Sequence, residues 1–133
     1  MSGRSDRRNA PAGPAAVLWD MDGTLVDTEP YWIACETALV TGYGGTWTTA
    51  DAHAMVGNAL HTSAAYLHDH GGVPLSSEEI IEHLLDGVSV QVKAHVPWRP
   101  GAVELLHRLV ELDVPTALVT MSFRRLSDIV VEA

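Results

Sequence analysis

The sequence predicts an α/β fold in which a Rossmann-like parallel-sheet core receives an all-helical insert. Two short apolar segments, residues 15–19 and 116–120, each end in polar residues, as strands of a buried parallel sheet do. An amphipathic helical pattern at 102–112 precedes the second segment. The order strand, helix, strand forces two parallel strands with a right-handed crossover. Residues 28–97 show only helical patterns, so we expect them to form an inserted cap.

The composition is that of a globular protein. The 133 residues are 47% apolar and 19% charged, which suits one domain or a small domain with an insert. The 8 Lys and Arg against 17 Asp and Glu give a net charge of −9, a poor balance for binding nucleic-acid backbones or anionic membranes. A single cysteine excludes an internal disulfide, and no apolar run reaches the roughly 20 residues of a membrane span. We therefore expect a soluble, cytoplasmic protein that binds neither nucleic acid nor membrane.

The first elements can be assigned in chain order. Residues 1–14 are rich in Arg, Ser, Gly and Pro without periodicity, and are predicted to be a disordered leader. After the strand at 15–19, Thr28 is placed to cap a helix that carries Pro30 in its first turn. A run of glycines that starts at Gly42 ends this helix.

The cap continues with further helices. Thr48 and Asn58 are suitable N-caps for two short helices. Ser76, with Glu79 three residues later, forms a capping box that opens a longer helix. The apolar positions of this longer helix recur at helical spacing, and they are Ile80, Ile81, Leu84, Leu85, Val88 and Val92.

The chain then returns to the core. Residues 96–101 contain two prolines and a glycine and are predicted to be a linker, and a last helix begins near Ser122. The core is therefore expected to consist of residues 15–27 and 98–133, which supply its first two strands only.

Polar side chains follow both predicted strands. Asp20 and Asp22 come after the first strand, and Thr120 and Ser122 come after the second. Parallel strands end at the same sheet edge, where α/β proteins bind ligands, so we expect these side chains to meet. Two carboxylates this close repel unless a cation lies between them, and Mg²⁺ prefers oxygen ligands and also binds phosphate. One carboxylate can then attack phosphorus while the other moves a proton, and Gly23 allows close backbone approach.

The simpler alternative is that these are ordinary turn residues, because Asp, Gly and Thr are common after strands. The pattern D-x-D-G-T, however, arises by chance in about one in a thousand chains of this length. Its position at the end of a predicted strand favours the chemical interpretation.

The stretch DMDGTLVDTEP, residues 20–30, resembles the first motif of the haloacid dehalogenase-like (HAD) hydrolase superfamily. The insert lies where the subfamily with a small helical cap carries one. The phrase WRPG at 98–101 is similar to that subfamily's return to the core, and VTMS at 119–122 resembles its second motif. The resemblance extends over residues 15–133.

This resemblance implies roles for the matching residues. Asp20 would be the nucleophile that forms an aspartyl-phosphate, and it would bind Mg²⁺ together with the backbone carbonyl of Asp22. Asp22 would also be the general acid and base, and Thr120 would hold the phosphoryl oxygens. An aspartate at position 22 indicates phosphoryl rather than halide chemistry. The only lysine, Lys93, lies at the far end of the insert, which argues against the phosphonate-cleaving relatives that need a cap lysine.

Further residues are candidates for substrate contact. Glu29 lies at the boundary of cap and core, where it either contacts substrate or serves as an acid at a helix N-terminus. Gly57 and Asn58 lie where relatives have a specificity loop, or they form an ordinary turn. The predicted substrate-binding set is Gly23, Thr24, Glu29, Gly57, Asn58, Met121 and Ser122.

The leading hypothesis is a Mg²⁺-dependent phosphatase of the HAD type that acts on a small phosphorylated metabolite such as a sugar phosphate. A phosphosugar mutase of the same family is one alternative, and a non-catalytic truncated protein is another. The family's third-motif lysine or arginine and fourth-motif acidic pair lie beyond the second motif, and the chain has 13 residues after Thr120. Arg124 and Arg125 follow too closely to be that basic residue, and they either approach a phosphate or lie on a solvated helix face. We therefore expect an inactive or incomplete fragment that self-associates through its unfinished sheet.

Overall fold

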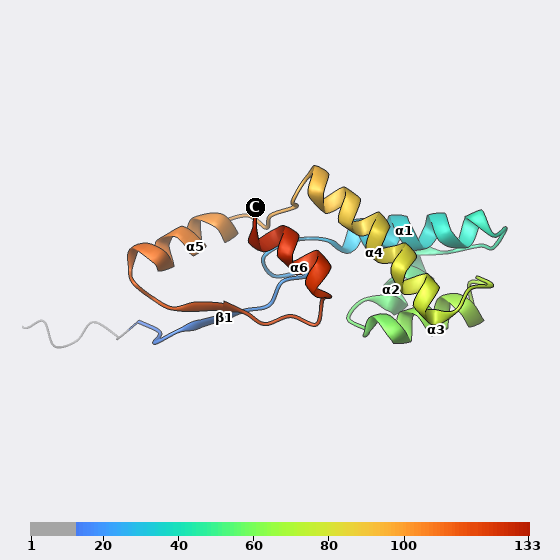
Figure 1. Ribbon diagram of the computed structural model, residues 1–133, viewed down its shortest axis with the longest axis horizontal. Helices are drawn as coiled ribbons and strands as arrows, with labels where there is room; N and C mark the ends of the chain where they lie inside the picture. The colour runs from blue at the N-terminus through green and yellow to red at the C-terminus, as the bar shows by residue number, and fades with distance from the viewer. Residues whose placement is uncertain (1–12) are drawn as a thin grey trace, which may run out of the picture.

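A computed structural model describes residues 13–133, which form two strands and six helices (Figure 1). Strands β1 (Val17–Trp19) and β2 (Thr116–Leu118) are far apart in sequence and pair in parallel along their whole length. The predicted α/β class, with parallel strands and a helical insert between them, is confirmed. Of the leader predicted at residues 1–14, residues 1–12 lie outside the described part of the chain.

Both strands are shorter than the predicted apolar segments. The ladder nevertheless extends one hydrogen bond beyond β2, because the Val119 amide donates to the Trp19 carbonyl oxygen at 2.7 Å. This bond keeps the two chain segments side by side up to the polar residues that follow them. The sheet is thin, and the Leu18 side chain in its middle is 71% exposed.

Four helices form the cap at one end of the elongated molecule (Figure 1). They are α1 (Glu29–Gly42), α2 (Thr49–Met55), α3 (Leu60–Asp69) and α4 (Ser77–Ala94). A buried apolar cluster joins α1, α3, α4 and the loop between α3 and α4, and is made of Leu39, Val40, Ala64, Leu67, Val73, Ile80, Ile81, Leu84 and Leu85. The six apolar positions predicted from the spacing of α4 are all buried.

The local signals for helix starts in the cap had different outcomes. Thr48 and Ser76 are N-caps, as predicted, and the capping box predicted at Ser76 is confirmed. Thr48 also forms a capping box, with Asp51, which was not predicted. Asn58 as an N-cap is wrong, because α3 has Ala59 in that position. The Asn58 side chain instead donates to the Ala54 carbonyl oxygen at 2.9 Å and so closes the preceding helix. A side chain that can bond in either direction along the chain does not reveal from sequence which helix it serves.

Two further helices, α5 (Ala102–Glu111) and α6 (Arg124–Val131), flank the strands. Helix α6 begins two residues after the predicted Ser122 and packs against α4 of the cap. A second buried cluster joins them, made of Met21, Leu25, Val26, Val88, Val92, Ala102, Leu126 and Val130. The C-terminal half of α4 therefore shares its core with the segment that follows β1 and with α6.

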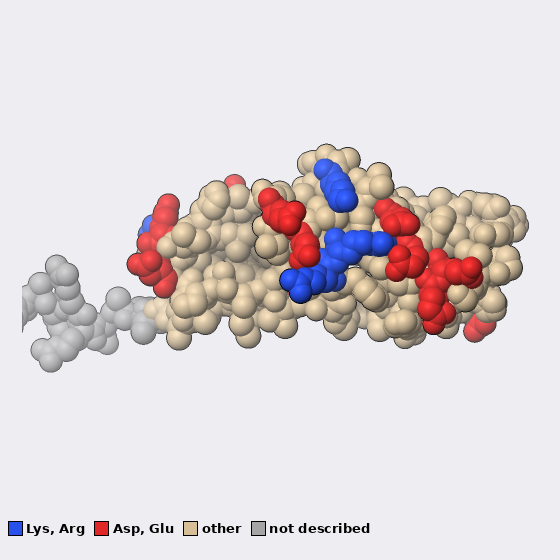
Figure 2. All heavy atoms as spheres, viewed as in Figure 1, with Lys and Arg blue, Asp and Glu red and all other residues tan. Residues whose placement is uncertain are grey.

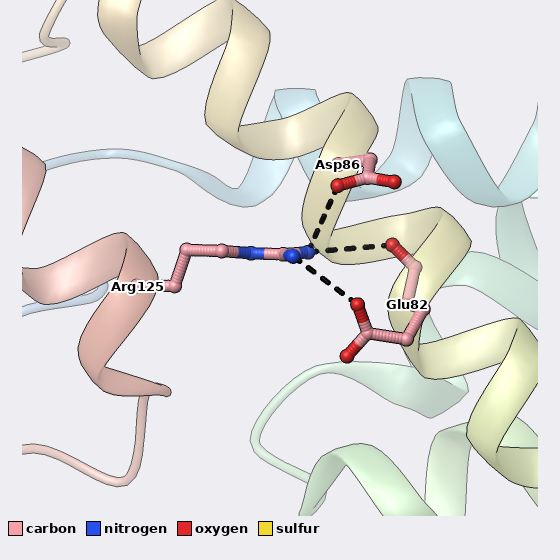
Figure 3. A network of polar contacts seen from close by, with 3 residues as sticks. All are labelled: Glu82, Asp86 and Arg125. Atoms are coloured by element: carbon pink, nitrogen blue, oxygen red, sulfur yellow. Dashed lines mark hydrogen bonds and ion pairs between the residues drawn. The ribbon is translucent and has the colours of Figure 1, made fainter.

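Ion pairs border this contact between α4 and α6. Arg125 Nη1 lies 3.1 Å from Glu82 Oε2, and Arg125 Nη2 lies 3.1 Å from Asp86 Oδ1 (Figure 3). Figure 2 shows basic side chains gathered where α6 meets α4, next to acidic side chains of the cap. Arg125 thus faces α4, and its charge is directed to the cap.

The two connections between core and cap also lie side by side. The Asp27 amide donates to the Pro97 carbonyl oxygen at 2.8 Å, and the Arg99 amide donates to the Leu25 carbonyl oxygen at 2.8 Å. The cap is therefore joined to the core through a paired linker. Within residues 13–133, no helix has the length and apolar character needed to cross a membrane.

Candidate active site

A cavity of about 480 Å³ lies between the ends of the strands and the cap. Its core side is lined by the residues that follow β1 and β2, namely Asp20, Asp22, Gly23, Thr120, Met121, Ser122 and Phe123. Its cap side is lined by α1, by α2, by the start of α3 and by the loop at 56–59. The sheet edge where the sequence places the polar residues is thus covered by the insert.

Both carboxylate oxygens of Asp22 accept hydrogen bonds in this cavity. Its Oδ1 accepts a hydrogen bond from the Thr28 hydroxyl, and its Oδ2 accepts one from the Ser122 hydroxyl. Thr28 is buried and is the N-cap residue of α1, but it makes no side-chain cap bond because its hydroxyl is directed to Asp22. The Asp22 carboxylate is therefore fixed between the start of the cap and the turn after β2.

Asp20 and Thr120 both lie just beyond the strands: Asp20 directly follows β1, and Thr120 lies two residues after β2. Asp20 is exposed, and its Oδ1 accepts a hydrogen bond from the Met21 amide at 2.8 Å. The Thr120 Oγ1 accepts a hydrogen bond from the Ser122 amide at 3.0 Å. Because that oxygen acts as an acceptor, the hydroxyl proton of Thr120 remains free to be donated to a ligand.

The predicted site residues come together in this cavity with one exception. Asp20, Asp22 and Thr120 all line it, and so do six of the seven residues of the predicted substrate-binding set. Thr24 does not line it, and is exposed in the turn after β1. Gly23 in the same turn has φ of +79°, a backbone conformation that favours glycine.

The cavity also contains cap residues that sequence reasoning missed, and Glu36 is the most unusual of them. Its side chain is only 4% exposed, and its Oε2 has no hydrogen-bond partner among the described residues. Burial raises the pKa of the Glu36 carboxyl from 4.5 to about 7. The spacing of Trp32, Glu36 and Leu39 along α1 places them on one helix face, which is the signal that marks this glutamate as inward-facing.

The oxygen donors in the cavity suit a hard divalent cation. Within residues 13–133, no three His, Cys, Asp or Glu side chains are grouped so as to hold a metal ion. Asp20 and Asp22 nevertheless place two carboxylates on one cavity, beside the hydroxyls of Thr120 and Ser122. Proteins commonly bind Mg²⁺ with one or two carboxylates, completing the coordination with water and substrate phosphate. These residues therefore fit a magnesium site.

The chain has a parallel α/β core with an acidic pair after its first strand and hydroxyls after its second. A helical cap covers both, and this arrangement defines a capped hydrolase-type fold. The chain belongs to the haloacid dehalogenase-like hydrolase family, whose sequence model matches residues 17–132. The family resemblance carried by the motifs at 20–30 and 119–122 is thereby confirmed.

Individual relatives agree with this assignment. A Drosophila melanogaster protein named "Probable pseudouridine-5'-phosphatase" is 28% identical over 105 residues, which cover 79% of this chain and 45% of that protein. The crystal structure of CbbY from Rhodobacter sphaeroides in complex with phosphate has a TM-score of 0.74 at 19% identity, and the match covers 90% of this chain and 56% of that one. A HAD hydrolase of family IA, variant 3, from Entamoeba histolytica has a TM-score of 0.74 at 16% identity, with 88% and 53% covered. The solved structures share the fold, and the chain spans about half the length of the curated relatives it matches.

Proposed function

We propose that this chain carries the catalytic acidic pair and the cap of a Mg²⁺-dependent phosphatase that hydrolyses small phosphate monoesters. The observation that carries the proposal is the convergence of Asp20, Asp22 and Thr120 on one cavity enclosed by the cap. The pseudouridine-5'-phosphatase name of the Drosophila relative supports a phosphate ester as substrate. We also propose that the protein is soluble and cytoplasmic, which its acidic composition and single cysteine support.

The proposed reaction has two steps. An Asp20 carboxylate oxygen attacks phosphorus, the bond from phosphorus to the leaving-group oxygen breaks, and Asp22 gives a proton to that oxygen. Water then attacks the phosphorus of the aspartyl-phosphate, and Asp22 takes up the proton that the water loses. The bond from phosphorus to Asp20 breaks, which releases phosphate and restores both side chains.

Each neighbouring group has a part in this chemistry. Asp20 through its carboxylate and Asp22 through its backbone carbonyl oxygen would hold Mg²⁺, whose charge would offset the repulsion between a carboxylate nucleophile and an anionic phosphate. The free hydroxyl proton of Thr120 is available to a phosphoryl oxygen. The two hydroxyls that bond Asp22 fix the direction from which it exchanges its proton. The cap forms one side of the cavity, and its closure over Asp20 would exclude bulk water from the reacting groups.

The proposal is tested by assaying phosphate release from p-nitrophenyl phosphate with and without Mg²⁺, in a version of the protein that has the full length of its curated relatives. We expect Asp20→Asn to lower the rate by at least about 10²-fold, since removing one directed charge or donor typically costs that much. Glu78→Gln, an exposed carboxylate at the start of α4, serves as the matched control and keeps the rate. Equal rates for the Asp20→Asn variant and the unaltered protein would refute the nucleophile. In a second assay with a sugar phosphate as substrate, an isomerised sugar phosphate in place of free phosphate would indicate a mutase.

A further inference from the structure

Glu36 is a buried acid that the proposed chemistry leaves unused. It lies on α1, one turn after Trp32, and both side chains line the cap side of the cavity. Its Oε2 is buried without a hydrogen-bond partner among the described residues, and burial raises the pKa of the carboxyl to about 7. A buried carboxylate without a donor costs stability, so a ligand that supplies the donor would relieve that cost.

The cavity offers few partners to a molecule with many polar groups. Away from Asp20, Asp22 and the hydroxyls beside them, most of the lining is apolar, and its larger side chains are Trp32, Ile33, Met55, Leu60, Met121 and Phe123. The Asn58 amide already donates to the Ala54 carbonyl oxygen. A ligand with several hydroxyls would leave some of them without partners, which costs free energy. A carbon chain, in contrast, gains free energy from burial along this lining.

The charges at the cavity favour a cation over a neutral group. Glu29 and Glu36 line its cap side, and among the described residues its one basic side chain is that of the exposed His61. A hydroxyl can donate one hydrogen bond to Glu36, but it leaves the charge of the carboxylate uncompensated. An ammonium group supplies up to three N–H donors together with the opposite charge. The indole of the half-buried Trp32, on the same side of α1, adds an aromatic face that attracts cations.

The position of Glu36 along α1 sets the length of such a ligand. Thr28, the N-cap of α1, bonds Asp22, and Glu36 follows eight residues later. At ~1.5 Å per residue, Glu36 lies roughly 12 Å along the helix from Thr28, and its side chain leans back toward the helix start. An ammonium group on Glu36 is therefore on the order of 10 Å from a phosphate at Asp20 and Asp22. An extended chain of about six carbon atoms spans that separation, whereas a two-carbon chain does not.

We propose that the cavity binds phosphate monoesters of apolar amino alcohols. The ammonium group pairs with the Glu36 carboxylate, the carbon chain runs along the apolar lining, and the phosphate lies at Asp20 and Asp22. The substrate class is then aminoalkyl phosphates whose two charges are on the order of 10 Å apart, rather than sugar phosphates, bisphosphates or phosphorylated acids. This inference rests on the proposed function, because it places the phosphate of the same molecule at the catalytic pair.

Calorimetric binding to the Asp20→Asn protein, in the version with the full length of the curated relatives, tests this inference without requiring hydrolysis. The ligands, with Mg²⁺, are 6-aminohexyl and 6-hydroxyhexyl phosphate as the long pair, and 2-aminoethyl and 2-hydroxyethyl phosphate as the short pair. Titrations are made at pH 8, where a carboxyl with a pKa of about 7 is ionised. We expect the long amine to bind about 10-fold to 100-fold more tightly than the long alcohol, the range for hydrogen bonds between charged groups. The short pair should agree within about 3-fold.

Two variants show whether the preference for the amine depends on Glu36. Glu36→Gln keeps the shape and removes the charge, so it should reduce the preference in the long pair to within about 3-fold and leave the affinity for 6-hydroxyhexyl phosphate within about 3-fold. Glu78→Gln removes an exposed cap carboxylate outside the cavity and should keep the preference.

Three outcomes would overturn the inference. The first is equal or tighter binding of 6-hydroxyhexyl phosphate compared with the long amine. The second is a preference for the amine that persists in Glu36→Gln. The third is a larger preference in the short pair, since a short chain reaches Glu29 at the start of α1 and not Glu36.

The results also separate this inference from the proposed function. If the full-length unaltered protein releases no phosphate from esters while Glu36-dependent binding of the long amine persists, the proposed function fails and the binding site stands. If that protein releases phosphate and shows no preference for the amine, only this inference fails.

Discussion

The buried carboxyl of Glu36 makes the stability of the folded chain depend on pH in a defined direction. The pKa is 4.5 in the unfolded reference and about 7 in the fold, where burial favours the neutral acid. Below about pH 4.5 the group is protonated in both states. Between pH 4.5 and 7 only the folded state keeps the proton, so the free energy of unfolding falls as pH rises through this window.

Replacing Glu36 by Gln should remove this dependence, because an amide does not titrate. We expect the free energy of unfolding to fall less between pH 5 and pH 8 in Glu36→Gln than in the unaltered protein. The difference should be on the order of 2 kcal/mol, allowing for water that enters through the cavity. Urea denaturation at the two pH values measures it, and Glu78→Gln should follow the unaltered protein. If the free energy of unfolding depended on pH equally in the Glu36→Gln and unaltered proteins, Glu36 would not be a buried carboxyl with a raised pKa.

The residues of the site differ in how far they could be predicted from sequence. Asp20 and Asp22 follow a strand, and a parallel sheet dictates where strand ends meet, so the sequence located them. Thr28 was assigned only as a helix cap, although its hydroxyl bonds Asp22. A hydroxyl can accept from a nearby backbone N–H or donate to a distant carboxylate, and the sequence does not show which of the two it does. Glu36 was missed for a related reason, since a charged residue in a helix is usually exposed and only packing reveals that this one is not.

At the scale of elements, the contact between α4 and α6 depends on apolar burial rather than on its ion pairs. Leu126 on α6 is fully buried, so Leu126→Ala should lower the free energy of unfolding by about 2–5 kcal/mol. The Arg125 side chain is 41% exposed and its partners Glu82 and Asp86 are more so. Arg125→Ala should therefore cost at most about 1 kcal/mol.

Urea denaturation of both variants at low and high salt checks this ranking. The effect of Arg125→Ala should shrink with added salt, because exposed charges are screened, whereas that of Leu126→Ala should not change. A larger loss for Arg125→Ala than for Leu126→Ala would show that charge determines the contact.

The sequence predicted the elements themselves better than their partners. The capping box at Ser76 and the apolar spacing of α4 specify that helix locally. The sequence also indicated a helix after the second strand, but not that it packs on α4. An apolar stripe shows that a helix face is covered, and it carries no information about which element covers it. The ion pairs of Arg125 were unpredictable for the same reason, since its partners lie about 40 residues earlier in the chain.

At the scale of the whole molecule, the two-stranded sheet is less well covered than the cap. Within residues 13–133, β1 pairs only with β2, and each strand has no second strand partner. Leu18 in β1 and Val119 after β2 are both largely exposed. Exposed apolar strands with open hydrogen-bonding edges pair readily with other chains. We therefore propose that the 133-residue chain associates with further copies of itself through this sheet.

Sedimentation over a range of protein concentrations tests this association. The weight-average mass should rise with concentration, and Leu18→Lys should reduce the rise, since a charged side chain on an exposed strand disfavours edge pairing. The substitution should change the free energy of unfolding by no more than about 0.5 kcal/mol, because the leucine is 71% exposed. Val90→Lys is the matched control, since Val90 is 67% exposed but lies on α4, away from the sheet. A single monomeric species at every concentration, or equal effects of the two substitutions, would show that the sheet does not mediate association.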